Sequence, residues 1–545
     1  VLLMLLAYRR PAYVVLGALP LATAGVIALA VVTALFGTVH GITIAFGFTL
    51  IGVAIDYPIF LFSHQLPGEP ALATARSIWR TLAIAVTGLC IAYLAFLLSG
   101  VKGLVQLACF NIAGLAAAGL STRYLLPRLT PDGMRDHGHM RLPAALAAGA
   151  AKLPRLGWLA STLAAAGIAV LVLVPGPLWD NDLGHLTPVP QAQLEQYAKL
   201  REALGAPDIR YLMTIEGATA EDVLAREEHL APDLRQLVSL HDIAGFENAA
   251  RYLPSAATQE RRQAALPDAM ALRAGLDQAL RGTAFRPGLF EPFVRDVERA
   301  RHLPPLTPAR VAGTPLELTL GSLLVNQGGT QQGGTQQAGS AQGGTQPGGR
   351  WIGLVTFTDL AKPQAVRRLA MRAGGAQLID LKQASDDLVA RQRTRIVWCI
   401  GGAALLLALV VLLALRKPAR AMQVLAPMAL TALLTLAILH AAGVALNLFH
   451  LIALVLAAGL GLDYGLFFER SAHDPIGRRR TLHAITVCAV AASTVFAVLA
   501  SSSLPVLRSI GVTVVMGVVG NFLFALILVR PDASALDGPM REPAA

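Results

Sequence analysis

The sequence predicts an α-helical polytopic membrane protein with two pseudo-repeats, together with a mixed α+β domain outside the membrane. Three observations predict this fold class: a series of long apolar runs, a motif that recurs far along the chain, and one long polar segment. Of the 545 residues, 54% are hydrophobic and only 14% are charged. Ordinary soluble domains contain about a quarter charged residues, so most of this chain is expected to lie in a bilayer.

The apolar runs are of the length that crosses a bilayer, since about 20 helical residues span the roughly 30 Å hydrocarbon core. Ten full spans are predicted, near 12–35, 42–63, 81–99, 104–126, 157–175, 395–415, 421–440, 449–468, 482–502 and 508–530. Residues 1–8 resemble the end of a further span. Because the sequence opens with Val1 and no initiator methionine, we expect an N-terminally truncated chain.

Lysine and arginine alternate between the short loops, which predicts the topology. Basic residues gather around positions 9–10, 76–80, 123–155, 416–420 and 470–480, whereas the intervening short loops contain only Lys102. By the positive-inside rule, residues 178–394 are then on the outer side. The formal net charge of +11 is thereby explained by topology, and dispersed basic residues do not predict nucleic-acid binding.

An internal repeat organises the chain. The segment around Asp56 recurs around Asp463 at a constant offset of 407 residues, so that Gly52-x-x-x-Asp56-Tyr57 matches Gly459-x-x-x-Asp463-Tyr464. Parallel repeats of this kind are a known transporter layout. The second half has one span, an outer domain and five further spans, whereas the first half lacks its first span and first outer domain.

These patterns divide the chain into six parts. They are a first-repeat bundle at 1–130, a cytoplasmic linker at 131–156, a span at 157–177, a periplasmic porter-like domain at 178–394, a second-repeat bundle at 395–530 and a cytoplasmic tail at 531–545. In the porter-like domain, strands are expected at 210–215 and 351–357 and helices at 220–237, 261–280 and 365–373. The Gly-Gly-Thr-Gln repeats within 326–349 indicate a disordered low-complexity insertion.

Asp56 and Asp463 are the only acidic residues inside the long apolar runs. An ionisable group at membrane depth costs roughly 2.5–3.5 kcal/mol on insertion scales, so its presence in both repeats indicates a role. Burial disfavours the charged form of a carboxyl, and a neighbouring phenol can donate a hydrogen bond to it. We predict a proton relay of Asp56, Tyr57, Asp463 and Tyr464, in which each aspartate faces the other repeat's tyrosine. The alternative is a buried helix–helix contact.

Other polar residues give weaker signals. Gly52 and Gly459 are predicted to let helices approach closely near the relay, or to be ordinary packing glycines. His64, His473 and His483 are expected to be solvated helix ends at the inner side. No phosphate-binding loop, Ser-His-Asp arrangement or metal-ligand spacing occurs, so neither an enzyme nor a cofactor is predicted. The four cysteines all lie in or at spans and predict no disulfide framework.

The duplicated Gly-x-x-x-Asp-Tyr motif and the two-repeat plan resemble the RND (resistance–nodulation–division) superfamily, and more narrowly its MMPL branch of lipid exporters. The resemblance covers the chain to about residue 530 and implies a proton relay at the four Asp-Tyr residues. The segments 52–58 and 179–190 are similar to predicted exporters linked to aryl-polyene or xanthomonadin-type pigment lipids. No lysine lies deep in a span, which distinguishes the chain from multidrug members of the superfamily.

The resemblance implies a multi-pass protein of a Gram-negative inner membrane that exports a lipid or hydrophobic, lipid-linked product by proton antiport. Its expected partners are protons, the lipid, and either further copies of itself or periplasmic accessory proteins. The alternative is a non-transporting, sterol-sensing-like membrane scaffold that binds lipid and a partner protein. The doubled Asp-Tyr favours a transporter, because a scaffold needs no titrating carboxyl in each repeat.

Overall fold

The computed structural model divides the chain into two compact units, Val1–Pro188 with Asp386–Ala545 and Val189–Ser385. The predicted linker 131–156, the tail 531–545 and nearly all of the low-complexity insertion lie outside the described residues. The described residues are 4–5, 8, 11–66, 68–130, 157–186, 189, 191–203, 208–286, 288–327, 350–471 and 475–529.

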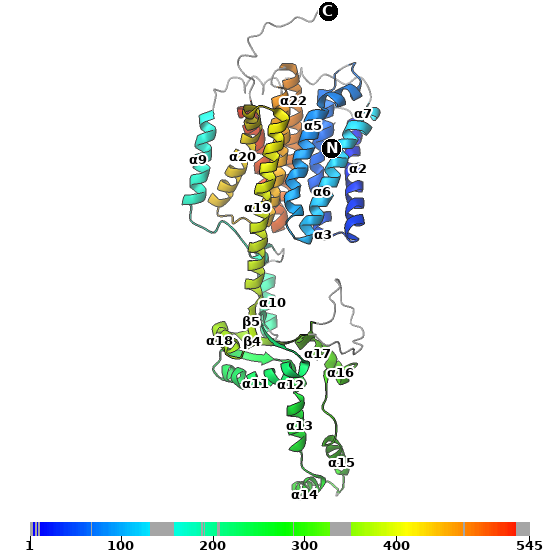
Figure 1. Ribbon diagram of the computed structural model, residues 1–545, viewed down its shortest axis with the longest axis vertical. Coiled ribbons are helices and arrows are strands. Elements are labelled where there is room, and N and C mark those ends of the chain that lie inside the picture. Colours follow the sequence, from blue (N-terminus) through cyan, green and yellow to red (C-terminus); the bar gives the residue numbers. More distant parts are fainter. Residues whose placement is uncertain are drawn as a thin grey trace, which may run out of the picture. The chain divides into compact units, whose positions relative to one another are not determined.

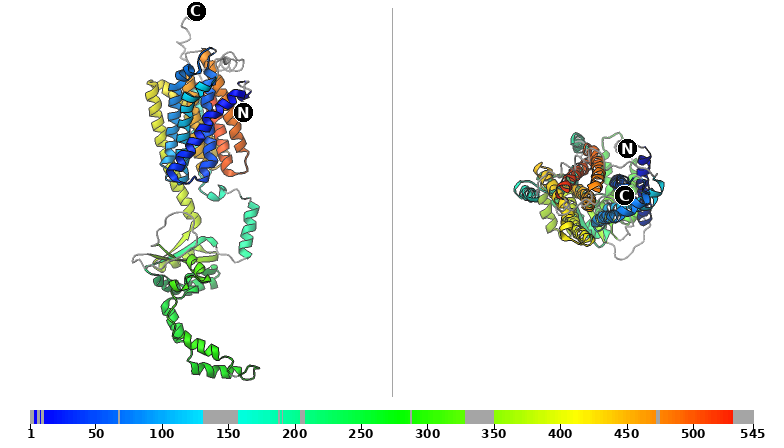
Figure 2. Two further views of the ribbon diagram at one scale, coloured as in Figure 1. Left: turned by 90° about the vertical axis from the view of Figure 1, so that its right-hand side faces the viewer. Right: turned by 90° about the horizontal axis from the view of Figure 1, so that it is seen from above.

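The first unit is a bundle of apolar helices (Figure 1). In Figure 2, right, the bundle is seen end-on. Its N-terminal part contains α2 (Pro11–Phe36), α3 (Gly41–Ile51), η1 (Gly52–Ile55), α4 (Asp56–His64), α5 (Ala71–Leu97), α6 (Lys102–Leu120), η2 (Ser121–Leu125), α7 (Leu126–Leu129) and α9 (Gly157–Leu173). Its C-terminal part contains α19 (Leu381–Leu415), α20 (Pro418–Ala441), α21 (Leu448–Arg470), α22 (Pro475–Ala500) and α23 (Pro505–Leu528).

Among the described residues, nine helical segments are long and apolar enough to cross a bilayer. They coincide with nine of the ten predicted spans. The tenth, predicted at 157–175, forms the shorter α9 of 17 residues, which packs against α20. The chain is therefore a multi-pass membrane protein.

The two matching motif segments differ in their backbone. In the second half, α21 runs unbroken through Asp463. In the first half, a short 3₁₀ segment, η1, separates α3 from α4, and Asp56 is the first residue of α4. Pro58 explains the difference, because it cannot donate the amide hydrogen bond that would continue the α-helix, whereas the matching residue is Gly465. A 3₁₀ interruption inside a helix often marks a hinge.

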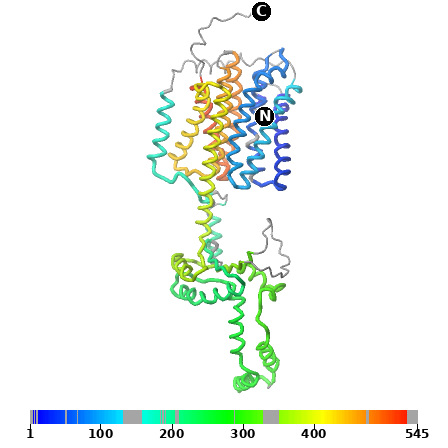
Figure 3. The backbone as a smooth tube through the Cα atoms, in the orientation of Figure 1, coloured from blue at the N-terminus to red at the C-terminus, as the bar shows by residue number. Residues whose placement is uncertain are grey.

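The second unit contains an antiparallel sheet in the order β2-β4-β1-β5, with β3 paired to β4. Figure 3 traces the path of the chain as a tube. The strands are β1 (Asp208–Gly217), β2 (Ile243–Glu247), β3 (Leu324–Asn326), β4 (Trp351–Leu360) and β5 (Ala376–Asp380). Met213 of β1 lies opposite Val355 of β4 and Leu378 of β5. Alternate residues of β4 are buried, including Val355 and Phe357, as expected for a sheet with one covered face.

Helices α11 and α18 pack against this sheet. The helices of the unit are α10 (Gln191–Ala203), α11 (Ala220–Ser239), α12 (Ala249–Tyr252), α13 (Ala256–Ala264), α14 (Ala269–Leu280), α15 (Glu291–Ala300), α16 (Pro308–Val311), α17 (Pro315–Leu323) and α18 (Pro363–Arg372). The predicted strands at 210–215 and 351–357 and the helices at 220–237 and 365–373 are confirmed. The single helix predicted at 261–280 is wrong, because Pro267 ends α13 and the Asp268 side chain caps α14 through the Ala271 amide at 2.7 Å.

The second unit contains a glutamate, Glu227, that is fully buried. Glu227 of α11 accepts a hydrogen bond from the Ala250 amide at 2.8 Å through Oε2, while Oε1 has no hydrogen-bond partner among the described residues. Burial raises the pKa of Glu227 from 4.5 to about 8, although the amides of Ala250 and Ala249 oppose the shift. The folded unit therefore holds this proton more tightly than the unfolded chain does.

We expect this unit to lose stability as the pH rises from about 4.5 to 8, because a raised folded-state pKa stabilises only while the proton stays bound. The upper limit of the loss is about 5 kcal/mol. Glu227→Gln should remove this slope, whereas Glu195→Gln on the exposed face of α10 should retain it. Urea unfolding of the full chain in detergent, followed by Trp351 fluorescence with the other four tryptophans replaced by phenylalanine, measures the difference. Parallel pH profiles for Glu227→Gln and the wild type would contradict the prediction.

Candidate functional site

The four predicted relay residues lie inside the helical bundle. Asp56 and Asp463 are each 1% exposed, and Tyr57 and Tyr464 are fully buried. The two carboxyl groups are close enough for their charges to interact. Four residues beyond each aspartate, Phe60 of α4 stacks on the matching Phe467 of α21, with ring centroids 3.7 Å apart and planes 7° apart. The two matching segments therefore meet face to face.

Each tyrosine lies within electrostatic range of the aspartate of the other half. The charge of Asp463 acts on the Tyr57 hydroxyl, and the charge of Asp56 acts on the Tyr464 hydroxyl. The neighbouring helices cross in the same reciprocal way, since α4 packs against α22 and α21 packs against α5. The structure thus brings the four side chains into one buried cluster.

The polar atoms of this cluster lack conventional partners. Both carboxyl oxygens of Asp463, Oδ2 of Asp56 and the hydroxyls of Tyr57 and Tyr464 have no hydrogen-bond partner in the described part of the chain. The Asp56 carboxyl differs from Asp463 in that the thiol of Cys488 on α22 lies against it. Buried polar groups are normally hydrogen-bonded, and an isolated buried carboxylate is very costly. A neutral, proton-carrying carboxyl is therefore the form that this site favours.

A second polar cluster lies at the predicted inner end of α4. Ser63 Oγ is 2.8 Å from the Tyr8 hydroxyl and 3.2 Å from Nδ1 of His483. His64 Nε2 is 2.9 Å from the Thr481 hydroxyl. The Tyr8 hydroxyl also donates to the Ile59 carbonyl at 3.1 Å. These bonds join α4 to α22 on the predicted inner side of the carboxyl groups.

The prediction that His483 is a solvated helix end is wrong, because its side chain is buried and bonded to Ser63. His64 is half-buried and also bonded, while His473 lies outside the described residues. Tyr8 interacts electrostatically with both Asp56 and Cys488, so the inner cluster reaches the carboxyl site. A sequence signal for it exists, since Ser63 follows Asp56 by two helical turns and thus shares its face.

The two motif glycines have different surroundings. A Cβ atom added to Gly459 would overlap the side chain of Leu89 on α5, whereas nothing lies within 4 Å of such an atom at Gly52. Close helix packing is therefore confirmed for Gly459, and the same prediction is wrong for Gly52. The break at η1 accounts for this difference, because it takes Gly52 out of the regular helix.

We expect Gly459→Ala to destabilise the bundle by about 1–3 kcal/mol, the usual cost of overpacking a core. Leu89 is itself buried, so it cannot move away freely. Gly52→Ala provides the matched control and should change stability by less than about 1 kcal/mol. Unfolding of the full chain by SDS in mixed micelles measures both variants. Equal stabilities of the two variants would contradict the difference in packing.

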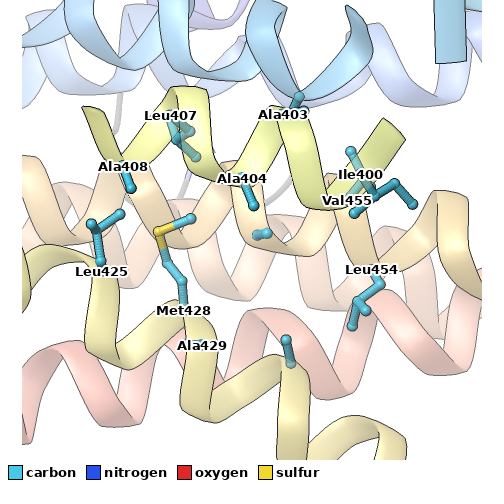
Figure 4. Close-up of a pocket in the computed structure, with 13 residues that line it drawn as sticks. Ile400, Ala403, Ala404, Leu407, Ala408, Leu425, Met428, Ala429, Leu454 and Val455 are labelled. Atoms are coloured by element: carbon cyan, nitrogen blue, oxygen red, sulfur yellow. The ribbon is translucent and has the colours of Figure 1, made fainter. Parts of the chain in front are cut away.

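An apolar groove lies beside this site. It has a volume of about 310 Å³ and is lined by residues of α5, α19, α20 and α21 (Figure 4). Small side chains such as Ala404 and Ala408 open it along α19, and Met428 lies across it on α20. Leu407 lines the groove and packs, together with Leu462, against Gly88 of α5. Leu462 directly precedes Asp463, so α21 both borders the groove and carries the Asp463 carboxyl.

Comparison with protein-family models and with curated proteins finds no match to this chain.

Proposed function

We propose that this chain is a proton-motive-force-driven exporter of a lipid or hydrophobic, lipid-linked product, in an inner membrane and of the MMPL type within the RND superfamily. The observation that carries the proposal is the meeting of two buried Asp-Tyr pairs between α4 and α21. Intramembrane carboxyls that face the bundle interior mark proton relays in pumps and transporters. Here, neither carboxyl forms an ion pair among the described residues, so each remains available to a proton.

The proposed mechanism transfers a proton between the two halves. A proton that crosses with the field releases about 2.3 kcal/mol per 100 mV. In the proposed route, a proton on Asp463 reaches Asp56 through the two phenols when motion of the helices brings these groups within hydrogen-bond distance. Tyr8, Ser63 and His483 then continue the route to the inner side. Protonation changes the charge of the interface between the two pseudo-repeats, which biases the rocking of one repeat against the other.

The proposed cargo enters laterally from the bilayer. The groove along α19 is apolar, its volume of about 310 Å³ suits part of a hydrocarbon chain, and α5 and α21 contribute to its lining. Both helices also supply neighbours of the relay, so filling the groove affects the packing at Gly88 and Leu462. An aryl-polyene or xanthomonadin-type pigment lipid fits such a groove, because its conjugated tail is long and apolar.

The test is transport by the full chain in proteoliposomes under an imposed pH gradient. A fluorescent polyene fatty acid reports the movement of cargo, and a trapped pH indicator reports protons. We expect flux of both that disappears when an ionophore collapses the gradient. Binding of the polyene without gradient-dependent flux would support the lipid-binding scaffold instead and would overturn the exporter.

A further inference from the structure

A pocket of about 630 Å³ lies within the unit Val189–Ser385, between the edge strand β2 and helices α11, α12 and α13. Four arginines from three helices line it: Arg235 of α11, Arg251 of α12, and Arg261 and Arg262 of α13. None of them belongs to the membrane-embedded site described above. The pocket is therefore a separate, strongly basic feature of the chain.

The four arginines outnumber the two carboxylates beside them, those of Glu247 and Glu228. Arg251 forms an ion pair with Glu247, with Nη1 3.2 Å from Oε1. In the described residues, the other three guanidinium groups have no carboxylate within ion-pair distance. Arg235 donates to the Ala231 carbonyl at 3.2 Å, and Arg261 donates to the Thr258 hydroxyl at 2.7 Å. Both of these acceptors are neutral, so these two bonds leave the guanidinium charges uncompensated.

One carboxylate, that of Glu228, also lines the pocket. It accepts three hydrogen bonds, from the Ser255 amide at 2.8 Å, the Ser255 hydroxyl at 2.6 Å and the Thr258 hydroxyl at 2.6 Å. Burial opposes ionisation, but these bonds and the charge of Arg261 hold the pKa of Glu228 below its usual value. Glu228 thus fixes the start of α13 against α11 and sets the spacing between Arg235 and the two arginines of α13.

Part of the remaining wall is apolar. Ala231 and Val238 of α11 and Phe246 of β2 line the pocket beside the guanidinium groups. Phe246 is half-buried and lies opposite Phe357 of β4 in the sheet register. A site that combines several guanidinium forks with an aromatic and aliphatic wall suits a ligand with an anionic end and an apolar end.

We propose that this pocket binds the anionic headgroup, a phosphate or carboxylate, of an amphiphile. The guanidinium groups of Arg235, Arg261 and Arg262 hold the anion, and Phe246 and Val238 contact the first part of the apolar chain. Binding does not require transport and does not depend on the proton relay. If the chain exports an anionic lipid as proposed above, this pocket receives the charged end of the cargo.

The test is titration calorimetry of the full chain in a non-ionic detergent, without a pH gradient. The probes are hexyl phosphate, inorganic phosphate and hexanol. We expect hexyl phosphate to bind more tightly than inorganic phosphate, and hexanol not to bind. The double variant Arg235→Gln/Arg262→Gln loses charge-assisted hydrogen bonds to the anion. It should therefore bind hexyl phosphate at least about tenfold more weakly.

The matched control is Arg281→Gln/Arg295→Gln, which removes the same charge from exposed positions elsewhere in the unit. It should bind hexyl phosphate as the wild type does, and Trp351 fluorescence should show the fold retained in both double variants. Unchanged affinity in Arg235→Gln/Arg262→Gln, or equal affinity for hexanol, would overturn the site. Equal affinity for inorganic phosphate and hexyl phosphate would overturn the amphiphile and leave a free anion as the ligand. None of these outcomes bears on the exporter, which only the gradient-driven flux tests.

Discussion

Asp463→Asn is expected to reduce gradient-driven flux through the reconstituted chain to background while leaving the protein inserted and folded. Asparagine has nearly the shape of aspartate but carries no titratable proton, so the transfer between the two halves stops. Neither carboxyl oxygen of Asp463 has a hydrogen-bond partner among the described residues. The substitution therefore removes no hydrogen bond among the described residues, and the free energy of unfolding should be unchanged or slightly higher.

Three further variants make this prediction specific. Asp277→Asn, on the exposed face of α14, is the matched control and should transport as the wild type does. Asp56→Asn should also abolish flux, and the double variant should be no worse than either single one, because residues that act as a unit are not additive. Proton-dependent export that persists in Asp463→Asn would contradict the relay.

The burial of the four Asp-Tyr residues in one cluster could be predicted from the sequence because the motif is repeated. Asp56 and Asp463 stand out against apolar surroundings, and the constant offset places matching residues of two helices together. The same offset relates Phe60 to Phe467, so the stacked pair is a consequence of the repeat that could have been predicted. The partners in the inner cluster could not be predicted from the sequence. His483 is distant from Ser63 in the chain, and only the packing of α4 on α22 brings the two side chains together.

Identical motifs gave one correct and one wrong expectation about packing. Gly52 and Gly459 occupy the same place in the motif, but Pro58 breaks the first helix and the glycine loses its close neighbour. Helix length was also underestimated, since α19 begins at Leu381 while hydropathy indicates only its apolar part from 395. The buried Glu227 was missed because a glutamate on an amphipathic helix normally faces water.

Filling the groove should block cargo without blocking the relay. Ala404→Trp introduces an indole among Ala408, Met428 and Leu407, where a hydrocarbon chain is proposed to lie. We expect cargo flux to fall at least about tenfold, equivalent to about 1.4 kcal/mol of lost binding. Competition by a bulky side chain in a preformed apolar site removes binding energy directly. The polyene flux assay measures the loss.

The neighbouring Leu405 supplies the control, because its side chain is 75% exposed and does not line the groove. Leu405→Trp places the same indole on the same helix and should retain flux. Infrared difference spectra measure proton binding at the carboxyl site through the band of the protonated carboxyl. This band should remain in Ala404→Trp and disappear in the double variant of Asp56 and Asp463. The two activities are then separable, since one depends on shape in α19 and the other on charge between α4 and α21. Equal flux in Ala404→Trp and Leu405→Trp would place the cargo elsewhere.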